Sequence, residues 1–225
     1  MRSKTLRLIT LLTLATPLAL SEDRDLASLH QVNILSRTRR NTRLMLHNRF
    51  RFYNDLSEFY QFRSGAIVYH DWKPRVQVLA GYYLLQQRAD DSSFQTVQRP
   101  WAGAQVSVYE RGKASLDWRN LVERHIYTGP GDFMRYRSRA MANFQPRGGW
   151  QPYAGAEALA LKGHVIGRYS VGVNYATERG HLLGFGYEFR QDVGNPGTHF
   201  ISTMVQFQVS GPRRREKPGE ADAPQ

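Results

Sequence analysis

The stretch that decides the fold reads VIGRYSVGVNYA at residues 165–176, LLGFGYEFRQ at 182–191 and THFISTMVQFQV at 198–209. In each run nearly every second residue is apolar, aromatic or glycine, with Thr203 as an exception, and this is the period of a β-strand. The alternate positions are mainly small, polar or charged, and turn residues separate the runs into hairpins. A broad aromatic face opposite a polar one indicates lipid outside and a polar lumen inside.

The same alternation extends back through the chain to Thr42 and divides residues 41–210 into about ten strands. We therefore predict an all-β fold, an antiparallel up-and-down transmembrane β-barrel of about ten strands, with twelve as the alternative. An even count is expected because bacterial single-chain barrels use one. An eleventh strand in residues 22–40 would put the mature N-terminus outside the cell. This segment, whose pattern is mixed, is expected to be a periplasmic lead-in, with a short helix or an extra strand as other interpretations.

The N-terminus has the pattern of a secretory signal peptide. Basic residues within the first seven positions precede an apolar run that ends near Ser21 at small residues. We predict that residues 1–21 are removed and that the mature protein lies in the outer membrane of a Gram-negative bacterium. A membrane anchor is the alternative, but the run is short and contains Pro17. The absence of cysteine excludes disulfides and thiolate chemistry.

Residues 211–225 follow the last strand and combine an Arg-Arg-Arg run with Pro, Gly, Glu and Asp. They have no apolar period, so we predict a disordered basic tail in the periplasm.

The formal net charge is +12 and is carried mostly by arginine. Nucleic acid is the usual partner of such a charge, but a secretory signal makes it an unexpected one here. The partners expected instead are outer-membrane lipid and lipopolysaccharide, and the barrel-assembly machinery during biogenesis. No cofactor, metal site or nucleotide fingerprint is expected.

Strand parity alone predicts a cluster of charged residues in the lumen. Its members are Arg99, Arg119, Glu123, Arg135, Arg137, Arg139, Glu157, Arg168, Glu188 and Arg190. In so narrow an interior, a charged side chain that lacks a partner of opposite charge costs several kcal/mol of stability, so these residues are expected to pair. A salt-bridged structural plug is the favoured interpretation, with Glu123 and Glu157 flanking the arginines of residues 135–139. Arginines outnumber carboxylates, however, so a narrow anion-selective pore or an anionic-ligand site that uses Arg137 is an alternative.

Four segments together resemble a known family. They are LDWRNLVERHIY (116–127), FMRYRSRAMANFQP (133–146), QPYAGAEALAL (151–161) and RYSVGVNYATERGHLLGFGYEF (168–189). They resemble an uncharacterised bacterial family of outer-membrane β-barrels, a domain of unknown function. The resemblance implies a fold and a location, but no activity.

An enzyme is not expected. Some small outer-membrane barrels modify lipid A through a serine, a histidine and an acid, so a lipid A hydrolase is kept as an alternative. The histidines considered for this role are His70, His125, His164, His181 and His199, of which His164 and His199 fall near the predicted outer rim.

Overall fold

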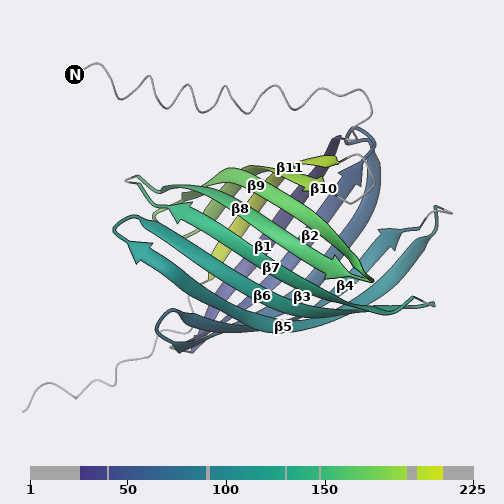
Figure 1. Cartoon of the computed structure of the whole chain (residues 1–225). Coiled ribbons are helices and arrows are strands. Elements are labelled where there is room, and N and C mark those ends of the chain that lie inside the picture. Colours follow the sequence, from purple (N-terminus) through teal and green to yellow (C-terminus); the bar gives the residue numbers. More distant parts are fainter. Residues whose placement is uncertain are drawn as a thin grey trace, which may run out of the picture.

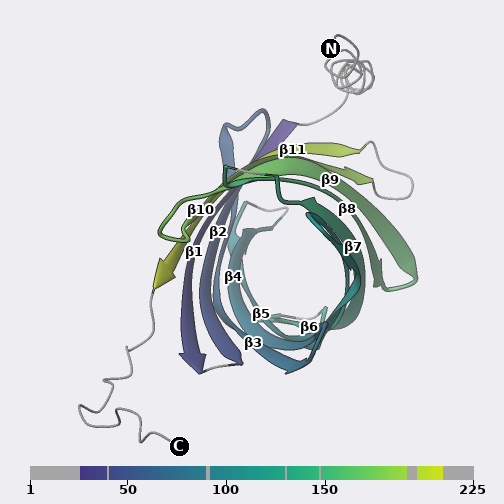
Figure 2. The same cartoon turned by 90° about the vertical axis from the view of Figure 1, so that its left-hand side faces the viewer.

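The chain folds into a closed barrel of eleven strands (Figure 1, Figure 2). In this computed structural model, residues 26–39, 41–89, 92–129, 131–146, 148–191 and 197–209 are described. The strands are β1 (Leu26–Arg39), β2 (Thr42–Tyr53), β3 (Glu58–Lys73), β4 (Val76–Arg88), β5 (Phe94–Arg111), β6 (Ala114–Tyr127), β7 (Phe133–Phe144), β8 (Trp150–Leu161), β9 (His164–Ala176), β10 (Leu182–Gln191) and β11 (Thr198–Val209). The predicted all-β barrel is confirmed.

The strand count differs from the expected ten because residues 22–40 contain β1. Strands β2 to β11 are the ten predicted ones, and each pairs antiparallel with its sequence neighbour. An odd number of strands joined by hairpins can close only if the first and last run in the same direction, and β1 pairs parallel with β11. The even-number rule was therefore the wrong argument against an extra strand. The expected signal peptide and basic tail lie outside the described residues.

The barrel has two ends with different connections, which we name after them. At the β3–β4 end the chain turns at residues 74–75 and 112–113, and β11 ends there. At the β2–β3 end the chain turns at residues 54–57 and 162–163, and β1 begins there. In the second of these turns Lys162 and Gly163 both have positive φ (46° and 80°), as a two-residue type I′ hairpin requires.

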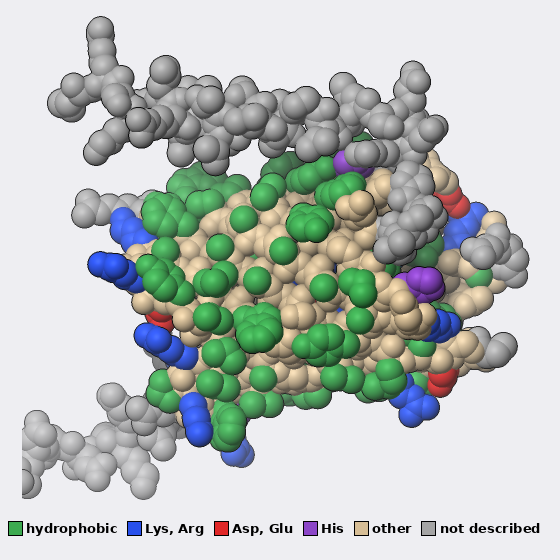
Figure 3. Space-filling view, viewed as in Figure 1, with side chains coloured by type: hydrophobic (Ala, Val, Ile, Leu, Met, Phe, Trp, Pro, Cys, Tyr) green, Lys and Arg blue, Asp and Glu red, His purple; other side chains and the backbone are tan. Residues whose placement is uncertain are grey.

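Side chains on the outer wall are predominantly apolar and exposed. Tyr169, Val171 and Phe185 are 55%, 54% and 58% exposed, and they occupy the face that the alternation assigns to lipid. Figure 3 shows hydrophobic side chains over the barrel wall, with Lys, Arg, Asp and Glu gathered toward its two ends. None of the described residues forms a helix long and apolar enough to span a membrane.

The lumen is filled on the β2–β6 side by a buried apolar cluster. It consists of Met45, Ile67, Leu79, Tyr83, Leu85, Val97, Trp101 and Leu121. Glycine makes room for its rings. Gly81 lies opposite Trp101, and a β-carbon there would come within 2.5 Å of the indole ring. Since Trp101 and Tyr83 stack at 5.6 Å between ring centroids, this wall of the barrel is packed like a protein core.

Candidate functional site: an ion-paired lumen

Opposite the apolar cluster, the wall from β6 to β10 carries a chain of alternating ion pairs. Glu123 is fully buried and accepts hydrogen bonds from Arg135 Nε and from Arg137 Nη1, each at 2.8 Å. Glu157 accepts hydrogen bonds from Arg137 Nε at 3.0 Å and Nη2 at 2.6 Å. Arg168 continues the chain, with Nη1 3.5 Å from Glu157 Oε2 and Nε 3.8 Å from Glu188 Oε1. We call these residues the ion-pair ladder: Arg135, Glu123, Arg137, Glu157, Arg168 and Glu188.

Strand register explains why these side chains meet. Glu123 lies directly opposite Arg135 across β6 and β7, and Glu157 lies opposite Arg168 across β8 and β9. Residues two positions apart on a strand share a face, so Arg137 follows Arg135 into the lumen and reaches both carboxylates. Arg137 is therefore the central rung and is not the unpaired cation that the anion-site alternative assumed.

The other predicted lumen residues lie outside the ladder. Arg119 and Arg139 are cross-strand partners that line the lumenal cavity. Arg99 is buried, lies opposite Tyr83, and forms no ion pair among the described residues. Arg190 lies opposite Arg168 and Thr198 on the inward face of β10.

The prediction missed a second polar group, on β1 to β3. His47 Nδ1 is 2.9 Å from Asn33 Oδ1, and His47 Nε2 is 2.8 Å from Arg63 Nη2. The Arg63 guanidinium also lies over the Tyr83 ring, 4.4 Å from its centroid. Arg49 and Arg51 face inward on the same strand as His47. The alternation of residues 42–53 places the polar residues of β2 on one face and could have identified them as inward. The pattern of β3 is irregular and does not show that Arg63 faces inward.

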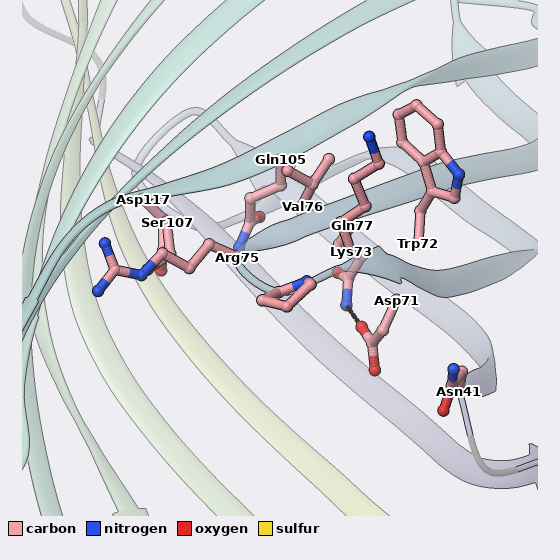
Figure 4. A pocket seen from close by; sticks show the side chains of 11 residues that line it. Asn41, Asp71, Trp72, Lys73, Arg75, Val76, Gln77, Gln105, Ser107 and Asp117 are labelled. Atoms are coloured by element: carbon pink, nitrogen blue, oxygen red, sulfur yellow. Dashed lines mark hydrogen bonds between the residues drawn. The ribbon is translucent and has the colours of Figure 1, made fainter.

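Two neighbouring cavities among the described residues lie in the lumen and at its β3–β4 end. The larger, of about 460 Å³, is lined by Arg49, Arg63, Arg119, Arg139 and the ladder carboxylates, among others. The smaller, of about 440 Å³, lies at the β3–β4 end around the turn at residues 74–75. Figure 4 shows its lining, with Gln77 Nε2 donating to Asp71 Oδ1 at 2.6 Å. Both cavities are lined by Gln105 and Asp117, so they meet at these residues.

The two ends of the lumen differ in burial. Three inward residues toward the β2–β3 end are nearly inaccessible: Leu85 and Val97 are 0% exposed and Phe200 is 1% exposed. Toward the β3–β4 end, by contrast, the side chains of Arg43 and Asp71 are 35% and 49% exposed. The inward side chains compared here are thus more deeply buried toward the β2–β3 end than toward the other.

The candidate histidines are dispersed. His125 lies in the lumen with Nε2 3.5 Å from Glu123, His199 contacts the Tyr187 hydroxyl on the outer wall, and His164 is exposed at the start of β9. His70 contacts the Thr42 hydroxyl, and His181 Nδ1 accepts from the Gln208 backbone N–H. No group of three or more His, Asp or Glu side chains among the described residues is placed to hold a metal ion.

A different histidine, not considered from the sequence, contacts a serine. On the outer wall near the β2–β3 end, His30 Nε2 is 3.1 Å from Ser28 Oγ and Nδ1 is 2.8 Å from Thr203 Oγ1. The i, i+2 spacing on β1 brings Ser28 and His30 together, but the mixed pattern of that segment left a strand as only one of its interpretations.

Fold and site together define a closed β-barrel with an apolar wall and an ion-paired lumen. The chain matches the family described as "Protein of unknown function (DUF2490)" over residues 29–199, and it belongs to this family. This confirms the resemblance to an uncharacterised β-barrel family. No curated protein and no solved structure matches the chain.

Glu157→Gln tests the ladder. The substitution leaves Arg137 and Arg168 beside a neutral group in a buried site, so we expect the free energy of unfolding to fall by roughly 3–5 kcal/mol. Urea unfolding of the refolded protein in detergent micelles measures this. The matched control is Asp71→Asn. Asp71 is itself exposed and its partner Arg43 is partly exposed, so this substitution should change the free energy by no more than about 1 kcal/mol. A Glu157→Gln protein with wild-type urea stability would show that the ladder does not hold the wall together.

Proposed function

We propose that the protein is an outer-membrane β-barrel of a Gram-negative bacterium whose lumen is closed, so that it does not conduct ions. The observation that carries this proposal is the burial of inward side chains at the β2–β3 end, combined with an apolar outer wall. The ion-pair ladder and the apolar cluster occupy the interior from opposite sides and act together as a plug. A pore, by comparison, requires a continuous hydrated path lined by groups that release the ion.

Removal of residues 1–21 and insertion by the assembly machinery into lipid and lipopolysaccharide belong to this proposal. The mature protein should fractionate with the outer membrane and migrate differently on gels before and after heating. Recovery as a soluble periplasmic protein would contradict the membrane location.

Planar-bilayer recording tests closure. The wild-type protein should give no discrete conductance steps, because bulky apolar side chains close one end. The double variant Leu85→Ala/Phe200→Ala removes two of these side chains and should introduce steps, which controls for insertion. Regular anion-selective steps from the wild type would support the pore instead.

Depth in the membrane can be tested at two equally exposed valines. Val171 and Val108 are 54% and 53% exposed on the outer wall, but Val171 lies near the middle of β9 and Val108 near the end of β5. Val171→Arg should cost roughly 2–4 kcal/mol in lipid vesicles, and Val108→Arg about 0–1 kcal/mol, because the penalty falls toward the interface. Equal costs in urea titrations would contradict a bilayer centred on mid-strand.

The Ser28–His30 contact supports a second candidate, a hydrolase that acts on an acyl chain in the surrounding lipid. In the tautomer with Nδ1–H donating to Thr203, His30 Nε2 can accept the Ser28 proton as a general base does. Thr203 supplies no charge to stabilise the imidazolium, which makes this the weaker proposal. A fluorophosphonate probe should label the refolded wild type and Ser64→Ala, which alters another wall serine, but not Ser28→Ala. Absence of labelling in the wild type would remove this candidate.

A further inference from the structure

Arg119 and Arg139 are two of the inward arginines that form no ion pair in the described part of the chain, and they lie beside the ion-pair ladder. Arg119 on β6 and Arg139 on β7 lie directly opposite each other, and both line the larger cavity. In the described part of the chain neither has a carboxylate oxygen within 4.0 Å, and the Nε of each is buried without a hydrogen-bond partner. Like charges directly opposite on one face of a sheet repel each other, so this pair weakens the barrel unless something offsets it.

The ladder does not supply the missing negative charge. Glu157 is the cross-strand partner of Arg139, but Arg137 and Arg168 already contact its two oxygens. Asp117, two positions before Arg119, accepts a hydrogen bond from Asn143 Nδ2 at 3.2 Å and forms no ion pair with Arg119 among the described residues. The arginine pair therefore has cationic capacity that these protein groups leave unused.

The pair is also accessible from one end. Gln105 lies opposite Arg119, and Gln105 and Asp117 are the residues at which the two cavities meet. A solute that enters at the β3–β4 end, past the side chains drawn in Figure 4, thus reaches Arg119 and Arg139 before the ladder.

We propose that Arg119 and Arg139 in the lumen bind a doubly charged oxyanion, such as phosphate or a phosphate monoester. Two guanidinium groups match the charge of such an anion, and each presents paired N–H donors to its oxygens. Gln105, Asn143 and Tyr69 line the same cavity and offer polar contacts to the remainder of a larger ligand. The volume of about 460 Å³ is that of a small-metabolite site.

This site does not depend on membrane location. It requires only the lumen and the access at the β3–β4 end. It also goes beyond closure of the barrel, because a barrel that conducts could still bind the anion, and a closed one could fail to bind it.

Calorimetry on the refolded protein in detergent, at constant ionic strength, tests the site with inorganic phosphate, and with chloride as the monovalent comparison. Phosphate should bind and raise the urea midpoint, since a ligand of the native state stabilises it. Arg119→Gln or Arg139→Gln should weaken phosphate binding by at least about tenfold, because each removes a charged hydrogen-bond donor. Arg111→Gln makes the same charge change at an exposed position and should bind as the wild type does.

Urea unfolding without phosphate distinguishes a binding role of the pair from a structural one. If the pair binds an anion, Arg119→Gln in phosphate-free buffer should unfold at the wild-type urea midpoint or above it, because the substitution relieves repulsion between like charges. A clear fall in that midpoint would assign Arg119 to the fold and overturn the proposal. Failure of phosphate to bind the wild type, or equal binding by Arg119→Gln and the wild type, would overturn it as well.

Discussion

Charge pairing inside a narrow lumen is the constraint on which this barrel depends. Glu123 forms ion pairs with Arg135 and Arg137, and Glu157 forms ion pairs with Arg137 and Arg168. Each carboxylate therefore links its own strand to a neighbouring strand. A buried charge that loses its partner costs several kcal/mol. A one-residue slip in the register of β7 would turn its arginines to the outer wall, among apolar side chains and away from the carboxylates. The ladder therefore fixes the register of β6 to β9 more strongly than backbone hydrogen bonds do alone.

The opposite wall, from β2 to β6, fills the part of the lumen that the ladder side chains do not occupy. Aromatic side chains lie flat against glycine there, as Trp101 does at Gly81 and Tyr83 at Gly65. Arg63 is held on this same wall, because it contacts His47 on β2 and also lies over the Tyr83 ring on β4. The cavity lies between these two walls, bounded by rings on one side and by charge on the other. This division leaves Arg119 and Arg139 beside the cavity with no ion pair among the described residues.

Sequence parity predicted most of the fold and part of the site. Alternation places Glu123, Arg137 and Glu157 on the inward face of adjacent strands. The strand order and the short turns then leave few ways for these charges to pair. Alternation could not identify which arginine remains unpaired, because that depends on which guanidinium reaches two carboxylates at once. Arg137 does so, whereas Arg119 and Arg139 do not. The inward position of Arg63 was not predicted because β3 mixes polar and apolar residues on both of its faces. The strand β1 was not among the ten expected strands for the same reason.

The contacts between β1 and β11 explain both why the odd-numbered barrel closes and why the alternation does not show β1. Parallel pairing is slightly weaker per residue than antiparallel pairing, so the β1–β11 seam gains from side-chain contacts across it. His30 on β1 bonds Thr203 on β11, and Arg51 on β2 lies over the ring of Phe200, 5.2 Å from its centroid. Ser28 and His30 face outward, where the wall is otherwise mainly apolar, and these polar residues interrupt the alternation that would have revealed the strand. The same side chains thus stabilise the seam and hide it, so a structural role for His30 exists whether or not Ser28 reacts.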